Sequence, residues 1–227
     1  PFVDFPVIAA CDALNGIQPE NLQSSPDFGV PQTTYSWTIT GTKDRGSFQL
    51  SFSSPLTLNP MEMVTSKLIS QSLEEEAGAS LDKDGKSIFW RGEPRTLTLS
   101  PKAGSPIENA PVILRWVAGT HLEKTDIICT PEFDAPSTSN VWTITPSSQK
   151  SGNFILELIL EGSQIPLTLP TCTLLSQDYS DEMVVKLDGV ELVGTGTVFN
   201  GGQKHDVSLA PKPTSPLAYM PVSLNWG

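Results

Sequence analysis

The chain contains one phrase twice, and this internal repeat constrains its fold more than any other feature. The first copy reads SWTITGTKDRGSF from Ser36, and the second reads VWTITPSSQKSGNF from Val141. The match extends further along each copy, where residues 81–116 correspond to residues 187–226. The repeating unit of roughly 110 residues has the size of one ordinary domain, and it is too long for a solenoid or propeller repeat.

Each copy is therefore predicted to fold as one domain, residues 1–117 and residues 118–227. Short stretches within a copy run apolar or alternate between apolar and polar residues, as in YSWTIT, SFQLSF, RTLTLS and VILRW. Clusters of Pro, Gly, Asn and Asp separate these stretches. This pattern is typical of short strands joined by tight turns, so it predicts an all-β sandwich in each copy.

The repeated phrase is interpreted as a core strand, its hairpin turn and the partner strand. Two facing sheets need a layer of inward side chains between them. The expected core residues are Trp37, Ile39, Phe48, Leu50 and Phe52 in the first copy, Trp142, Ile144, Phe154, Leu156 and Leu158 in the second, and the closing Trp116 and Trp226. SQSLEEEAGAS is the one credible helix. We expect a loop or a single helical turn there, with the run Glu74-Glu75-Glu76 in solvent.

The frame WTIT…SGNF…PLTLP…LDG…LAPKPTSPL…PVSL.W resembles the immunoglobulin-like modules repeated in very large bacterial surface or secreted proteins, such as adhesins. The resemblance covers essentially the whole chain and implies two tandem immunoglobulin-like β-sandwich domains. It implies a non-enzymatic spacer, with an adhesive surface as an extension, at an extracellular location. The implied partners are neighbouring immunoglobulin-like repeats. The resemblance brings no catalytic residue, and the paired Cys…Trp…Cys framework of antibody domains is missing.

A ligand-binding module is the alternative hypothesis. Loops at one end of a sandwich would then bind a carbohydrate or a host surface protein. The candidate binding residues are Glu74, Glu75 and Tyr179, in loops that differ between the copies, and Tyr219, an aromatic residue that we expect to be exposed.

Asp82 and Asp84 in LDKDGKS are candidate calcium ligands, because the stretch resembles the start of a D-x-D-x-D-G loop. The third oxygen ligand and the distant Glu of such a loop are missing. The second copy keeps only the pair Asp188-Gly189 at this place. A turn with Asp-Gly at positive φ explains both copies, so we expect a turn and no cofactor.

The charge balance argues against nucleic acid as a partner. The net charge is −11, with 14 Lys and Arg against 25 Asp and Glu, whereas a protein that binds phosphate backbones needs a basic stripe. No run of about eighteen apolar residues exists, so no membrane insertion is expected. The start, PFVDFPVIAACDALNG, lacks the features of a signal peptide, and we expect a fragment or a processed product.

The three cysteines are expected to be free. Cys11 and Cys129 occupy equivalent places in the two copies, so they are not expected to pair with each other. A Cys129–Cys172 bridge within the second copy is the alternative that the sequence leaves open. Unpaired cysteine commonly behaves as a small buried hydrophobic residue.

No enzyme is predicted, since the two histidines do not form a catalytic arrangement. His121 and His205 are not equivalent in the two copies. Asp206 and Ser208 are neighbours of His205 on one expected strand, where alternate residues face opposite ways. A catalytic triad instead needs residues that converge from separate segments.

Overall fold

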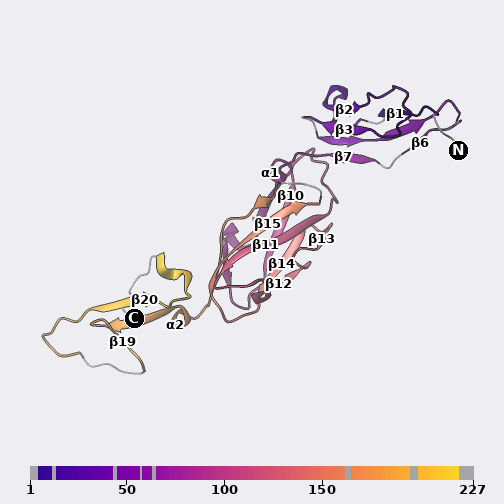
Figure 1. Cartoon of the computed structure of the whole chain (residues 1–227). Helices are drawn as coiled ribbons and strands as arrows, with labels where there is room; N and C mark the ends of the chain where they lie inside the picture. The colour runs from indigo at the N-terminus through magenta and orange to yellow at the C-terminus, as the bar shows by residue number, and fades with distance from the viewer. Residues whose placement is uncertain are drawn as a thin grey trace. The chain divides into compact units, whose positions relative to one another are not determined.

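The computed structural model describes residues 5–11, 14–42, 45–56, 58–62, 65–161, 165–194 and 199–219. Their regular structure is almost entirely extended, with two four-residue α-helices and four short 3-10 helices, which confirms the predicted all-β class (Figure 1). Two compact units are present. The first comprises Pro1–Gly78, Leu99–Pro111 and Leu160–Leu167, and the second comprises Ala79–Thr98, Val112–Ile159 and Thr168–Gly227.

The N-terminal strands form three small antiparallel sheets within the first unit. The elements are β1 (Ile8–Cys11), η1 (Pro19–Asn21), β2 (Leu22–Ser25), β3 (Thr38–Gly41), β4 (Gly46–Phe48), β5 (Leu50–Ser53), β6 (Met61–Glu62) and β7 (Ser66–Leu68). The sheets have the orders β1-β5-β6, β2-β3 and β4-β7. Ile17, Leu22, Phe48 and Leu50 form their buried cluster.

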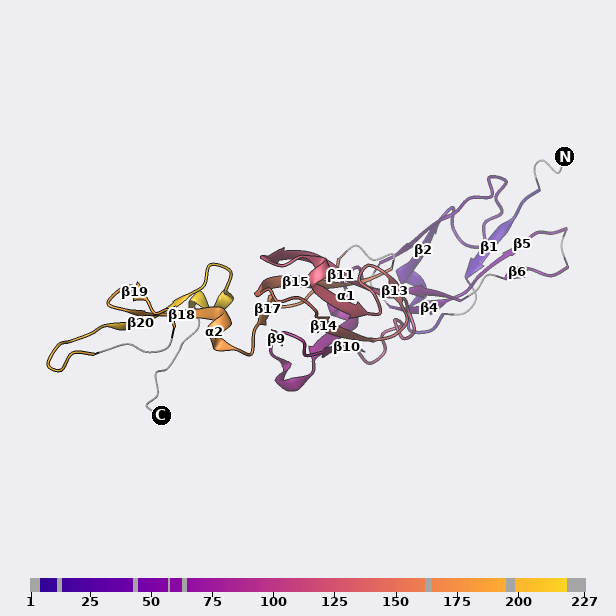
Figure 2. The same cartoon turned by 90° about the horizontal axis from the view of Figure 1, so that it is seen from below.

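The middle of the chain forms two larger sheets (Figure 2). Its elements are α1 (Leu73–Glu76), β8 (Ala77–Leu81), η2 (Lys83–Gly85), β9 (Ile88–Trp90), β10 (Arg95–Pro101), β11 (Val112–Thr120), η3 (Lys124–Asp126), β12 (Ile127–Thr130), β13 (Pro136–Ser137), β14 (Val141–Pro146), β15 (Gly152–Leu160), β16 (Leu167–Thr168) and β17 (Cys172–Leu175). The sheet orders are β12-β14-β10-β8 and β13-β11-β15-β17-β9, with β16 beside β15. Every second residue of β15 is buried, as on a sheet with one inward face.

The C-terminal elements are α2 (Tyr179–Glu182), β18 (Met183–Leu187), β19 (Val190–Glu191), β20 (Val207–Pro211) and η4 (Pro216–Tyr219). The three strands form a sheet of order β19-β18-β20. Asp188 and Gly189, with φ of +51° and +81°, make the turn between β18 and β19, which confirms the predicted Asp-Gly turn in the second copy. In the first copy the prediction was wrong in detail, because residues 83–85 form η2, with positive φ at Lys83 and Gly85. None of the helices in the described ranges is long and apolar enough to cross a membrane.

Several strand pairings combine the two sequence copies, and two of them show it most clearly. β10 pairs antiparallel with β14, so that Leu97 lies opposite Trp142. β9 pairs in parallel with β17, with Phe89 opposite Leu174. In each pair one strand comes from residues 1–117 and the other from residues 118–227. The domain boundary at residue 117 stays a prediction, and these pairings count against it.

The predicted core is complete in the second copy only. Its five residues, Trp142, Ile144, Phe154, Leu156 and Leu158, are at most 1% exposed. In the first copy Phe48 and Leu50 are buried, whereas the prediction was wrong for Trp37, Ile39 and Phe52, which are half-buried. The physical reason is that β14 has Leu97 of β10 beside Trp142, whereas β3 pairs with β2 alone among the described strands.

The closing tryptophans differ from expectation as well. Trp116 is half-buried instead of fully buried, and its ring stacks on that of Phe154 with the centroids 5.4 Å apart. Trp226 lies outside the described residues.

Candidate functional site

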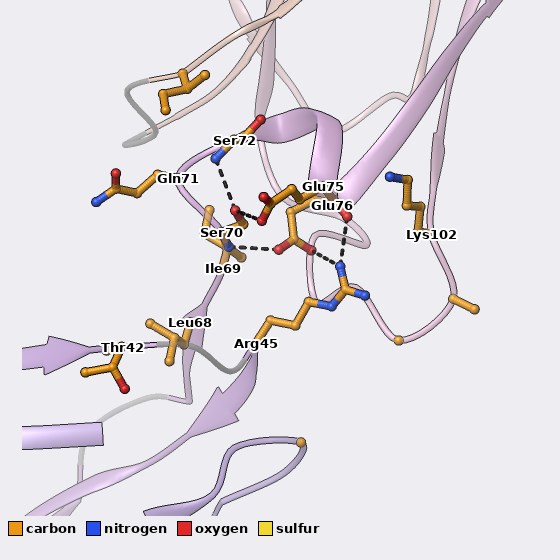
Figure 3. A pocket seen from close by; sticks show the side chains of 15 residues that line it. Thr42, Arg45, Leu68, Ile69, Ser70, Gln71, Ser72, Glu75, Glu76 and Lys102 are labelled. Carbon is orange, nitrogen blue, oxygen red and sulfur yellow. Dashed lines mark hydrogen bonds and ion pairs between the residues drawn. The ribbon is translucent and has the colours of Figure 1, made fainter. Parts of the chain in front are cut away.

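A polar pocket of about 1180 Å³ opens in the first unit, where the chain passes from β7 to β8 (Figure 3). Four charged side chains line it, Arg45 and Lys102 as cations and Glu75 and Glu76 as anions. Lys102 Nζ donates a hydrogen bond of 2.5 Å to the carbonyl oxygen of Glu74. The pocket therefore has cationic and anionic groups side by side.

Glu76 is completely buried at this pocket, so the prediction that the whole acidic run is solvated was wrong for its last member. Its carboxylate accepts hydrogen bonds from the backbone N of Ser70 at 2.8 Å and from Ser105 Oγ at 2.6 Å. Arg45 Nη1 lies 3.6 Å from Glu76 Oε2 (Figure 3). Both carboxylate oxygens are thus engaged by the chain itself. We name Arg45, Ser70, Glu76 and Ser105 the first clamp.

The single turn of α1 puts Glu76 in this position. Residues three apart on a helix lie on one face, and Leu73 and Glu76 are both buried while Glu74 and Glu75 are exposed. Ser72, the residue before the helix, makes no side-chain capping bond. A four-residue helix at this place confirms the prediction of a loop or one helical turn.

The second copy builds an equivalent site around Glu182, which is 1% exposed. Glu182 Oε1 accepts a bond of 2.8 Å from the backbone N of Ser176 and a short bond from Ser151 Oγ. Arg91 Nη2 lies 3.5 Å from the same oxygen. We name Arg91, Ser151, Ser176 and Glu182 the second clamp.

The two clamps share their acid and its local partners but not the origin of their arginine. Ser176 Oγ donates to Asp181 Oδ2 at 2.8 Å, just as Ser70 Oγ donates to Glu75 Oε2 at 2.5 Å. The arginines differ, because Ser151 stands where the repeat places Arg45. Arg91 instead approaches from between β9 and β10.

Three of the four candidate binding residues fall on these two helical turns, and the fourth, Tyr219, ends η4. Glu74 and Glu75 are exposed on α1, and Tyr179 is 46% exposed as the first residue of α2. Arg45 Nη1 donates to the carbonyl oxygen of Glu75 at 2.8 Å. The side chain of Tyr219 lies outside the described residues. Ligand binding by the four residues stays a prediction.

Asp82, the first candidate calcium ligand, forms an ion pair with a buried arginine. Arg95 Nε lies 2.8 Å from Asp82 Oδ1. Desolvation acts to raise the pKa of Asp82, but hydrogen bonds from Arg95 and from the backbone of Thr96 outweigh it and lower the pKa below 3.8. The side chain of Asp84 lies outside the described residues. Calcium binding stays the untested alternative to a turn, and the Arg95 ion pair counts against it.

A metal site has no other candidate in the described part of the chain, where no group of three His, Cys, Asp or Glu side chains is arranged to hold an ion.

His205 is the residue of the second copy that corresponds to Arg95, and it contacts Asp188, which corresponds to Asp82. Its Nδ1 lies 2.8 Å from Asp188 Oδ2, while the backbone N of Asp206 donates to Asp188 Oδ1 at 2.9 Å. Asp206 therefore contacts Asp188 through its backbone. The contact holds the turn between β18 and β19 against β20.

None of the three cysteines forms a disulfide, as predicted, and no Cys129–Cys172 bridge is present. Burial raises the pKa of Cys129 to about 12. Burial also raises the pKa of Cys172 to about 12, against a smaller opposing effect of Arg95. A thiol that stays protonated at neutral pH is a poor nucleophile.

The clamps are the candidate functional residues that sequence reasoning missed. A signal was present, because both copies place Glu six residues after Ser, at Ser70 and Glu76 and at Ser176 and Glu182. Both copies also contain a Lys-x-x-Ser-Pro run, which supplies Ser105 in the first copy.

Comparisons with known proteins do not place the chain in a family. No family model matches it, and no curated protein matches it significantly. One solved structure, described as the D0-D1 domain of Intimin, is similar over 75% of this chain and 80% of that chain. Its sequence identity is 9% and its TM-score is 0.29, a value too low to carry an argument about fold or function.

Proposed function

We propose that this chain is a structural spacer of tandem immunoglobulin-like modules from a larger bacterial cell-surface or secreted protein. The support is the duplication of the chain together with the duplication of the clamp. A spacer needs each connection between sheets to be held in one conformation. The two clamps occupy such connections.

The position of the clamps along the chain carries this proposal. The first clamp holds α1, which joins β7 of one sheet to β8 of another, and the second holds α2, which joins β17 to β18. In each case a buried carboxylate binds the backbone of the segment that enters the helical turn, at Ser70 or Ser176. Opening the turn would leave a buried charge or backbone N–H without its partner, at a cost of several kcal/mol. The clamps therefore stiffen the connections.

The surroundings of the groups that could act as a base or a nucleophile support a non-enzymatic role. Glu76 has both oxygens bonded, so it is not available as a general base. The imidazole of His205 contacts Asp188, and the thiols of Cys129 and Cys172 have raised pKa values.

Small-angle X-ray scattering of the whole chain tests the spacer role. We expect an elongated particle with a narrow distribution of maximum dimensions. Glu182→Gln should broaden that distribution, because the neutral amide removes the buried negative charge that pairs with Arg91 and weakens the bonds that Glu182 Oε1 accepts. Glu191→Gln, at an exposed position in β19, is the matched control and should leave the distribution unchanged. A compact globular particle, or a Glu182→Gln profile identical to wild type, would contradict the proposal.

A ligand-binding role is the second candidate, and the pocket beside Glu75 is the observation that favours it. Binding of a carbohydrate or a host surface protein should be lost in a Glu74→Gln and Glu75→Gln double variant. The exposed Glu191→Gln variant should bind like wild type. A glycan and host-matrix array with no signal for the wild-type chain would argue against this role.

A further inference from the structure

Strand β3 has one edge without a partner strand in the described part of the chain. β3 pairs with β2 alone. Just beyond β3, Thr42 N donates to the carbonyl oxygen of Asn21 at 2.9 Å, on the β2 side. Its counterpart beyond β14, Ser147 N, donates to the carbonyl oxygen of Asp126 at 2.9 Å, on the β12 side. β2 therefore pairs with the edge of β3 that corresponds to the β12-paired edge of β14. The open edge of β3 corresponds to the edge of β14 that pairs with β10.

Among the described strands, β20 has the complementary open edge. It is the last strand in the sheet β19-β18-β20. Its partner β18 matches β8 in the repeat, and β8 is one of the two neighbours of β10. The other neighbour of β10 is β14. The open edge of β20 therefore corresponds to the edge of β10 that pairs with β14.

Apolar side chains at both edges are partly exposed. Trp37 and Ile39 line a groove of about 590 Å³ together with Leu50, Phe52 and others, all within the first unit. The counterparts of these four residues in the second copy are Trp142, Ile144, Leu156 and Leu158, and each is 0% exposed.

The same contrast holds for β20. Val207 is 48% exposed, whereas its counterpart Leu97 in β10 is 0% exposed. Both positions are apolar, so Val207 is exposed because β20 lacks, among the described strands, the neighbour that β14 provides for β10. An apolar strand with an open edge is a ready template for strand addition.

We propose that β20 of one molecule of this protein pairs antiparallel with β3 of a second molecule and covers the groove beside β3. The β10–β14 pair sets the register, in which Leu97 lies opposite Trp142 and Thr96 opposite Thr143. The corresponding register places Val207 opposite Trp37 and Asp206 opposite Thr38. Each molecule carries both edges, so the contact is heterologous and adds molecules head to tail. These edges are separate from the clamps, so self-association and the spacer role can fail independently.

Sedimentation equilibrium of the whole chain tests the association. The weight-average mass should rise at least about twofold between roughly 1 μM and 1 mM, the range of weak association. Val207→Lys puts a charge on the pairing edge and should keep the chain monomeric. Val193→Lys, at a 90% exposed position outside β20, is the matched control and should associate like wild type. A wild-type chain that stays monomeric at 1 mM overturns the proposal.

Disulfide trapping tests the register. Backbone N–H groups of successive residues point to alternate sides of a strand. Ser147 N points to the β12 side of β14, so Thr143 N, four residues earlier, points to the same side. Thr143 therefore forms a non-hydrogen-bonded pair with Thr96 of β10. Cα atoms in such a pair lie about 4.5 Å apart, within reach of a disulfide. Thr38→Cys with Asp206→Cys should therefore give a ladder of linked oligomers under mild oxidation.

The matched control pairs Thr38→Cys with Ser208→Cys, which lies two residues out of register, about 7–8 Å away, and should give no ladder. The unsubstituted chain supplies the background from its native cysteines. Equal ladders for both pairs, a dimer from Asp206→Cys alone, or a crosslink confined to the monomer would each overturn the head-to-tail pairing.

Discussion

Arg95 should contribute more to stability than its ion pair with Asp82 indicates. Its side chain is 3% exposed. Arg95 Nη1 donates to the carbonyl oxygens of Lys86 at 2.9 Å and Ile88 at 2.5 Å, and Nη2 donates to the carbonyl oxygen of Asp82. The guanidinium thus holds the segment between β8 and β9 by its backbone. Arg95→Met keeps the apolar stem in place and removes every donor.

The expected losses in the free energy of unfolding follow from how deeply Arg95 and Asp82 are buried. Removing one member of a buried, hydrogen-bonded charge network costs about 3–5 kcal/mol, because the carbonyl groups are left without donors. At about 2–4 °C per kcal/mol for a chain of this length, a loss of about 4 kcal/mol lowers the unfolding midpoint by about 8–16 °C. The Asp82 side chain is 33% exposed. Asp82→Asn should therefore cost about 1 kcal/mol or less, as exposed ion pairs do.

Thermal and urea unfolding of both variants, followed by tryptophan fluorescence, measures the difference. Arg95→Met should lose several times as much free energy of unfolding as Asp82→Asn. Equal losses would mean that the carboxylate holds the segment and the carbonyl bonds do not, and the reasoning from burial would be refuted.

Three further outcomes are expected. Ile144→Ala should cost about 2–5 kcal/mol, and Ile39→Ala at the half-buried counterpart clearly less, in urea unfolding of the whole chain. Cys129 and Cys172 should react with a thiol reagent at pH 8 only after urea unfolding, and rapid labelling of the native chain would contradict their burial. Desolvation raises the pKa of Asp126, but hydrogen bonds from Glu123 N and from Lys150 outweigh it and hold the pKa below 3.8. Asp126 therefore stabilises the fold above about pH 4 and loses that effect at lower pH. Asp126→Asn should flatten this acid-side loss, and an unchanged pH profile would contradict the assignment.

Local features of the fold follow from local sequence. Alternating apolar residues in VWTIT and in the run from Phe154 predict β14 and β15 because side chains of a strand point to alternate faces. The pair Asp188-Gly189 predicts its turn, because two successive residues at positive φ strongly favour this dipeptide. The acidic stretch predicts a single helical turn. Each of these features depends on fewer than about ten residues of context.

The assignment of strands to sheets does not follow in the same way, because a repeat defines a period and not a starting point. A period of roughly 110 residues is equally compatible with a fold that begins at the first residue of each copy and with one that begins in the middle. The pairing of β10 with β14 joins the later part of the first copy to the earlier part of the second. Burial then differs between identical residue types, since Trp142 is fully buried and Trp37 is half-buried.

The clamps show the same limit at the level of one side chain. The contact of Ser70 N with Glu76 spans six residues, and the contact of Ser176 N with Glu182 also spans six. Such a short-range contact is therefore present in both copies of the repeat. The arginine in the second clamp lies 91 residues before its glutamate, in the other copy. At the aligned position of Arg45 the second copy has Ser151. Alignment of the copies can therefore identify the buried acid and its backbone partner. It cannot identify the cation, because a neighbouring copy can supply a long-range partner from a different place in the chain.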